Sequence, residues 1–287
     1  MKSIAPSRVA FAALLAASAS LTAAPVIEES FDYFPAGSRL QTYTQSATGL
    51  TANWSDSGTL VANPGLFYGT LATSGNKVTM SDDTSWVDTG TTLDGLLDDG
   101  DTLWFSVLVK PHSLSTNPDF GFALATDKGN DSNNVPLSNS GSGLGFRFKG
   151  GLKATAWSGG SPSSAGAVSG VTAGEVTLIV GRMTFGATSG DPDTIDIWLA
   201  DENRTFDEPN PGSTQTATLD QTAFDTITFM NKSANPRDEV DEIRFGETSG
   251  DVLPIETVAP TVVSITDDQG GGPIGEDIVV VTYTVSF

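Results

Sequence analysis

Short apolar runs recur along most of the chain, and each is bounded by turn-forming residues such as glycine, asparagine, aspartate and serine. Alternation is clear in one run, where Ile195, Ile197 and Leu199 share one face and Asp196 and Trp198 take the other. This period of two is typical of a β-strand, and helix-period patterns are scarce. The pattern predicts an all-β sandwich or barrel built from many short strands. The clearest predicted strands are residues 103–109, 120–125, 144–148, 176–185, 195–199, 227–230 and 240–245.

Two features of the pattern predict how the sheets are covered. Residues 103–109 (LWFSVLV) are apolar on both faces, which predicts a central strand with the second sheet on one side and loops on the other. The stretches 127–143 and 158–174 are long and polar, and they predict loops with little to bury. Loops of this kind on a rigid sandwich often carry binding residues, although they can equally be simple connections.

The first 24 residues have the layout of a secretory signal peptide. Lys2 and Arg8 precede an apolar run of nine residues at 9–17, and small residues follow. The run is shorter than the roughly 20 residues that a membrane span requires, so we expect a cleaved signal and no membrane insertion of the mature chain. This predicts an extracellular or cell-surface protein.

The pattern changes near residue 253. Residues 25–252 are predicted to form the main domain, and residues 253–260 a proline-containing linker. Residues 261–287 contain two further apolar runs around a glycine-rich turn. Two strands do not make a stable domain, so we expect a truncated β-domain that continues in a longer protein.

Composition excludes several functions. The chain has 35 acidic and 14 basic residues, which argues against nucleic acid and anionic membranes as partners. It has no cysteine and a single histidine, so the usual zinc ligands are missing and stability must come from the core rather than from disulfides.

Three stretches together resemble a known family. They are ESFDYFPAG at 29–37, TLWFSVLVK at 102–110 with the two strands that follow it, and VTLIVGRMTF at 176–185 with IDIWL and the closing VDEIRFG at 240–246. In this order they resemble laminin-G-like domains of the concanavalin A-like lectin/glucanase superfamily, in the form found on secreted bacterial proteins. The resemblance spans residues 26–252 and implies a jelly-roll sandwich of two antiparallel sheets with adjacent first and last strands. The tail resembles the start of a bacterial immunoglobulin-like or cadherin-like repeat.

The superfamily includes retaining glucanases, so catalysis must be considered. Their two carboxylates lie on one strand as Glu-x-Asp-x-Glu, and here Glu239 and Asp241 fit the first two positions. Ile243 and Arg244 stand where the second glutamate belongs, and strand alternation places Glu242 on the opposite face. We therefore expect no enzyme activity.

Candidate binding residues are more plausible than catalytic ones. Oxygen ligands at Asp127, Asp131 and Asn133 predict a Ca²⁺ site in one loop, against the alternative of a solvated turn. A second combination joins Asp32 with Asp241 or Glu242 if the end strands are adjacent.

The tryptophans offer a second kind of binding surface. Trp157 and Trp198 are the candidates for exposed rings on which a sugar can stack, although tryptophans are more often partly buried packing residues.

Together these features predict a secreted, non-catalytic lectin-like or adhesive module that binds a glycan or another extracellular polymer, with calcium as a candidate cofactor. One alternative is a structural spacer without a ligand, part of a large surface protein. A second is a polysaccharide hydrolase with an atypical site. The fold alone does not decide among them.

Overall fold

The computed structural model describes residues 24–42, 44–80, 84–91, 93, 95–115, 119–127, 135–232 and 238–255. The predicted signal peptide up to residue 23 and the predicted tail from residue 256 lie outside these ranges, as does most of the predicted linker. Within the described ranges, no helix is both long enough and apolar enough to span a bilayer.

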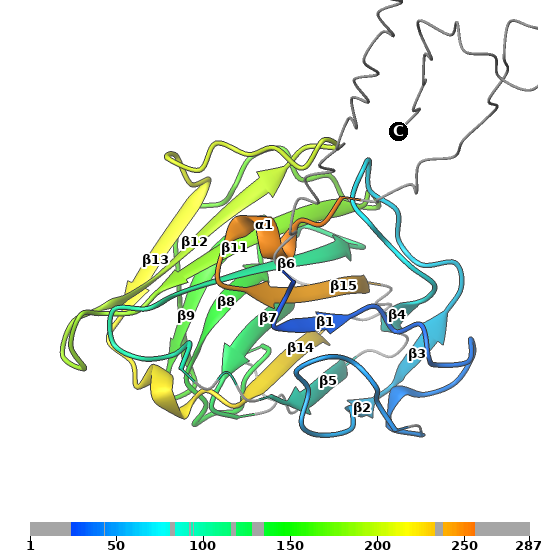
Figure 1. Ribbon diagram of the computed structural model, residues 1–287, viewed down its shortest axis with the longest axis horizontal. Coiled ribbons are helices and arrows are strands. Elements are labelled where there is room, and N and C mark those ends of the chain that lie inside the picture. The colour runs from blue at the N-terminus through cyan, green and yellow to red at the C-terminus, as the bar shows by residue number, and fades with distance from the viewer. Residues whose placement is uncertain are drawn as a thin grey trace, which may run out of the picture.

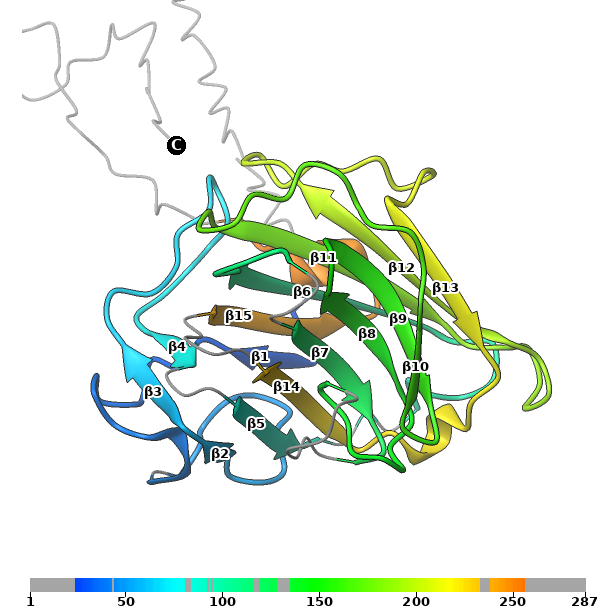
Figure 2. The ribbon, with the colours of Figure 1, turned by 180° about the vertical axis from the view of Figure 1, so that it is seen from behind.

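Two antiparallel sheets face each other in the described part of the chain, which confirms the predicted all-β sandwich (Figures 1 and 2). One sheet has eight strands in the order β13-β12-β11-β6-β15-β4-β3, with β1 pairing with β15 as well. The other has seven strands in the order β10-β9-β8-β7-β14-β5-β2. Consecutive strands alternate between the sheets in places, as in a jelly roll.

The strands of the eight-stranded sheet are β1 (Ile27–Glu29), β3 (Thr59–Ala62), β4 (Lys77–Met80), β6 (Thr102–Lys110), β11 (Thr177–Thr184), β12 (Asp193–Ala200), β13 (Ser213–Ala217) and β15 (Glu239–Gly246). Those of the seven-stranded sheet are β2 (Ser55–Ser57), β5 (Thr84–Gly90), β7 (Asp119–Ala125), β8 (Gly143–Phe148), β9 (Leu152–Ser158), β10 (Ser161–Ser164) and β14 (Thr226–Lys232). The short helices are η1 (Leu40–Thr42), η2 (Gln221–Ala223) and α1 (Ser249–Val252).

Each of the seven predicted strands is confirmed, as β6, β7, β8, β11, β12, β14 and β15. One stretch predicted to be a loop, 158–174, instead contains β10. Its sequence SPSS carries no apolar signal, and it pairs with β9 through the backbone at the edge of the sheet. Backbone pairing of this kind leaves no hydrophobic pattern to read.

The main core lies between the sheets and is rich in phenylalanine. Phe105 of β6 lies 5.6 Å from Phe122 and 6.3 Å from Phe146 of the facing sheet, measured between ring centroids. Gly181 on β11 leaves room for this ring, because a Cβ there would lie 2.1 Å from Phe105 atoms. The alternating apolar residues of both sheets therefore face inward, as the period of two requires.

A second apolar cluster covers the outer face of the eight-stranded sheet. Trp104 and Leu108 of β6 pack there with Leu66 from the β3–β4 loop and with Val252 of α1. The Ser106 hydroxyl also donates to the Val252 carbonyl. The prediction that strand 103–109 is covered on both faces is thus confirmed.

The first and last strands are adjacent, as the resemblance implies. Strand β1 pairs antiparallel with β15, and the Val26 amide donates to the Phe245 carbonyl at 2.8 Å. Strand β15 lies between β1 and β6 near the middle of the sheet (Figure 1). The β3–β4 loop, residues 63–76, contacts the outer face of β15, so polar side chains on that face lie beneath this loop.

Candidate functional site

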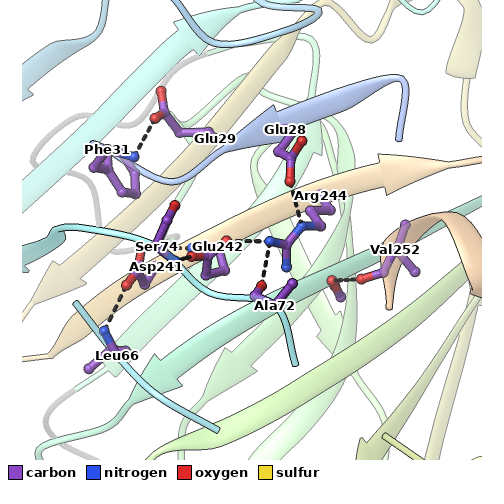
Figure 3. A network of polar contacts seen from close by, with 11 residues as sticks. Glu28, Glu29, Phe31, Leu66, Ala72, Ser74, Asp241, Glu242, Arg244 and Val252 are labelled. Carbon is purple, nitrogen blue, oxygen red and sulfur yellow. Dashed lines mark hydrogen bonds and ion pairs between the residues drawn. The ribbon is translucent and has the colours of Figure 1, made fainter. Parts of the chain in front are cut away.

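The closing strand β15 carries charged side chains beneath the β3–β4 loop, residues 63–76 (Figure 3). Asp241 accepts a hydrogen bond from the Leu66 amide at 2.7 Å, and Glu242 accepts one from the Ser74 amide at 2.5 Å. Both carboxylates are fully buried. Two adjacent residues of one strand therefore contact the same loop.

This arrangement corrects the expectation that Glu242 faces away from Asp241. The pairing of β15 with β6 shifts register between Asp241 and Arg244, and Glu242 has a φ of 50°. The extra residue of such a β-bulge breaks the strict alternation of side chains. The sequence carries a sign of it, since the core residues Val240, Ile243 and Phe245 are spaced by three and then two.

Both carboxyls have a raised pKa. Burial is the main cause that raises the pKa of Asp241 to about 9, and the neighbouring Glu242 contributes to this rise. Burial also raises the pKa of Glu242 to about 7, against the lowering effect of Arg244. Because like charges close together in a medium of low polarity repel, the pair favours at least one bound proton near neutral pH.

Arg244 joins three segments at this point. Its Nη2 donates to Glu242 and, at 2.8 Å, to the Ala72 carbonyl of the loop. Its Nε donates to Glu28 of β1 at 3.1 Å. The guanidinium is almost fully buried, whereas the Glu28 side chain is 44% exposed. Arg244 therefore fastens the loop and the first strand to the last strand.

A third buried carboxylate, that of Glu29, lies on the neighbouring strand β1. Glu29 accepts hydrogen bonds from the Phe31 amide at 2.7 Å, from Trp54 Nε1 at 2.7 Å and from the Tyr33 hydroxyl. Burial raises its pKa, and these three donors oppose the rise. The motif ESFDYF thus anchors the start of the domain to the core around Trp54.

These acids have no open face for a substrate. Asp241 and Glu242 lie under the loop, and Glu239 forms an ion pair with Lys77 at 3.1 Å. A retaining glycosidase needs two carboxylates that flank an accessible bond. The described contacts fit a structural role, in which the network holds the loop against the sheet.

The residues of this network do not fit a metal ion. All four oxygens of the Asp241 and Glu242 carboxylates already accept hydrogen bonds, and Arg244 adds a positive charge beside them. Asp32 lies close enough to raise the pKa of both acids, but its own side chain is exposed. Across the described residues, no three acidic, histidine or cysteine side chains are grouped to hold a metal.

The structure corrects the expected exposure of both tryptophans. Trp157 is 0% exposed and lies in a small cluster with Leu137, and Trp198 is 2% exposed. The Trp198 ring stacks with Trp104 at 5.7 Å and contacts Phe206 at 5.4 Å. Neither ring offers a free face for sugar stacking, because a loop covers each outer surface of the sandwich.

The predicted calcium loop is only partly described. Asp127 accepts a hydrogen bond from the Ser138 hydroxyl, while Asp131 and Asn133 lie outside the described residues. The end of this loop was expected to bury little, yet Val135 and Leu137 are fully buried against the seven-stranded sheet. Gly121 of β7 permits this approach, since a Cβ there would lie 2.7 Å from Pro136. The missed signal is the short apolar run VPL inside a polar stretch.

A small pocket opens between the β5–β6 connection and η2, and the sequence did not indicate it. Its volume is about 240 Å³. Buried apolar side chains and exposed polar groups share its lining, which consists of Thr91, Leu93, Gly95, Leu97, Asp98, Thr222, Phe224 and Asp225. The Asp225 carboxylate accepts from the Thr226 hydroxyl at 2.8 Å. Among the described residues, the Asp98 carboxylate has no hydrogen-bond donor, and the lining contains no basic group.

The chain was compared with known proteins. No family model matches the sequence, and no curated protein matches it. Among solved structures, the chain is similar to a carbohydrate esterase of the Shiga toxin-encoding bacteriophage phi24B, with 13% identity, a TM-score of 0.41 and coverage of 67% of this chain and 88% of the other. It is similar to a legume lectin-like domain from Entamoeba histolytica, with 10% identity, a TM-score of 0.39 and coverage of 68% and 90%. It is also similar to an alginate lyase from Chlorella virus, with 8% identity, a TM-score of 0.40 and coverage of 68% and 93%. Likeness at this level assigns neither a family nor an activity to the chain.

Proposed function

We propose that this protein is a secreted, non-catalytic module that binds a carbohydrate or another hydroxyl-rich extracellular polymer. The pocket beside η2 carries the proposal. Its buried Leu93, Leu97 and Phe224 offer an apolar floor, and Asp98 and Asp225 offer carboxylate oxygens at the exposed rim. Ligand pockets combine these two elements, since apolar contact provides affinity and a few polar groups fix orientation.

The chemistry of the rim favours a neutral ligand rich in hydroxyl groups. An ionised carboxylate only accepts hydrogen bonds, and sugar hydroxyls are donors. With two carboxylates and no basic residue in the lining, an anionic ligand would be repelled. The volume of about 240 Å³ is below the roughly 300–1,000 Å³ of typical ligand pockets, so the pocket suits a small part of a polymer rather than a long enclosed chain.

The test is binding of the full chain to a panel of neutral oligosaccharides, measured by glycan array and then by calorimetry. Asp98→Asn is expected to weaken binding about tenfold or more, because a hydrogen bond to a charged acceptor contributes about 1.5–3 kcal/mol. Glu175→Gln, which changes another exposed acid outside the pocket lining, is the control and is expected to leave affinity unchanged. Release of reducing sugar from a β-glucan panel would contradict the non-catalytic proposal and favour the hydrolase.

The ligand-free spacer is the second candidate, and one observation favours it. Each described tryptophan, namely Trp54, Trp104, Trp157 and Trp198, is at most 5% exposed. None of these four rings therefore offers a stacking platform for a polymer. Absence of binding across the panel, with the chain folded, would favour the spacer.

Calcium stays part of the proposal through the loop that begins at Asp127. A ligand that binds only the folded chain raises its stability by RT ln(1 + [L]/Kd). The thermal midpoint in millimolar Ca²⁺ is expected to exceed that in EDTA by several degrees, and Asp127→Asn is expected to remove the difference. Equal midpoints in both buffers would exclude calcium.

A further inference from the structure

Large exposed hydrophobic side chains are few in the described part of the chain, and two of them lie close to the point where the chain leaves the sandwich. Phe67 is 72% exposed, Ile255 is 55% exposed and Leu60 is 37% exposed. Phe67 lies on the β3–β4 loop, whereas Leu60 lies on β3 before it. Ile255 is paired with Leu71 of the same loop through an antiparallel bridge. Two large exposed apolar side chains on segments that pair with each other form a candidate interaction surface.

The loop that carries Phe67 is held firmly on both sides. The Tyr68 hydroxyl donates to the Ala200 carbonyl at 2.8 Å, and the Thr70 amide donates to the Glu202 carbonyl at 2.8 Å. Gly69 permits this close approach, since a Cβ there would lie 1.9 Å from the Glu202 carbonyl oxygen. Phe67 is therefore exposed on a fixed segment, which lowers the entropy lost when a partner covers it.

A single arginine ties the same loop to the end of the domain. Arg204 donates through Nη1 to the Leu253 carbonyl at 2.6 Å and through Nε to the Thr70 hydroxyl at 3.1 Å. The Ala72 amide also donates to the Pro254 carbonyl. The chain thus leaves the sandwich directly beside the loop that carries Phe67.

The place where the chain leaves the sandwich points to the partner. Ile255 pairs with Leu71, and a turn closed by the Leu71 amide and the Tyr68 carbonyl lies between Leu71 and Phe67, so the chain leaves within a few residues of Phe67. At about 3.3 Å per extended residue, residues 256–263 have enough length to reach that side chain. Their sequence, ETVAPTVV, includes three valines.

We propose that Phe67 and Ile255 form a docking patch for the segment 256–263, which packs on it and fixes how the chain leaves the sandwich. Because the two parts are joined covalently, the segment is present at a high effective concentration and needs only a small contact area. The patch would hold the following residues at a defined orientation to the domain instead of leaving them on a free tether. This role is independent of the pocket beside η2.

Photo-crosslinking of the full chain tests the proposal. The photoreactive analogue p-benzoylphenylalanine replaces Phe67, and mass spectrometry locates the crosslink. The expected product is an intramolecular link to residues 256–263, with no such link when the same analogue replaces Thr216 on β13 at the far edge of the sheet. Crosslinks that form only between two chains, or none to this segment, would overturn the proposal.

Hydrogen exchange gives a second, independent readout. Phe67→Ser is expected to increase deuterium uptake in residues 256–263 at least severalfold relative to the wild-type chain, while uptake in β6 and β15 stays the same. The unchanged strands show that the variant is folded. Equal uptake in the segment for wild type and Phe67→Ser would refute the docking patch.

Discussion

Arg244 is the residue whose replacement tests the charge network most directly. Its guanidinium is 3% exposed and contacts Glu242, which is fully buried. Removing one partner of a buried ion pair costs about 3–5 kcal/mol, because the remaining charge is left without compensation. We expect Arg244→Met to lower the free energy of unfolding by this amount at pH 8.

The penalty is expected to depend on pH, because Glu242 can bind a proton. Its pKa rises from 4.5 to about 7 on folding, and loss of Arg244 removes the effect that lowers it. At about 1.4 kcal/mol per pH unit, keeping Glu242 neutral at pH 8 in the variant costs about 5 kcal/mol relative to the unfolded chain. In the wild type, Glu242 loses its proton above the folded pKa of about 7, so the cost no longer increases with pH beyond that point and reaches about 3.5 kcal/mol. At pH 5 the two proteins bear the same cost, so the penalty of the variant is about 1.4 kcal/mol smaller there than at pH 8.

Urea unfolding at pH 5 and pH 8, followed by tryptophan fluorescence, measures both values. Arg244→Lys is the control, since it keeps the positive charge and loses only the paired hydrogen bonds. A penalty for Arg244→Met that is equal at the two pH values would refute the reasoning. So would an Arg244→Lys variant as unstable as Arg244→Met at pH 8.

Three further predictions follow from other contacts. Gly181→Ala is expected to destabilise the domain by about 1–3 kcal/mol in urea unfolding, because the added Cβ would overlap the Phe105 ring. Gly190→Ala is the control and is expected to be nearly neutral, because there is open space around Gly190. Equal destabilisation by the two substitutions would exclude overlap as the cause. Glu29→Gln is expected to cost about 1–3 kcal/mol and shift tryptophan emission, because the amide group cannot accept from all three donors, Trp54 included; wild-type stability and emission would contradict this. The thermal midpoint of the wild type is expected to fall as pH rises from 5 to 9, because the raised folded pKa values of the buried β15 carboxyls favour their protonated forms; a midpoint that rises over this range would disprove it.

Hydrophobic pattern was enough to predict the central strands, but not the edges or the coverings. The runs at 103–109 and 195–199 must bury their side chains, and this requirement is visible in the sequence. The edge strands Ser55–Ser57 and Ser161–Ser164 are held by backbone hydrogen bonds, which leave no such trace. The alternation of apolar and polar residues along a strand indicates which side chains face the core between the sheets. It does not indicate whether a loop distant in the sequence covers the outer face of that strand.

The candidate site shows the same limit. Trp198 was expected to be exposed because it lies on the opposite face of its strand from Ile195, Ile197 and Leu199. In the structure, Phe206 from the connection after β12 covers it. The carboxylate pair depended on one inserted residue, since the bulge at Glu242 reverses the side on which that side chain lies. The pocket beside η2 joins residues near 95 and 225 that no local motif links.

The pairing of β1 with β15 has a consequence for how the chain acquires its structure during synthesis. The hydrogen bond between Glu28 and Arg244 joins residues 216 positions apart, so β1 gains its partner strand in the sheet only after β15 has been synthesised. Contacts of such long sequence separation slow folding, because the ends of a large loop must meet before they gain anything. Strand β1 therefore joins the sheet only after almost the whole domain has been synthesised. The net charge of -21 opposes aggregation of the chain before this pairing forms.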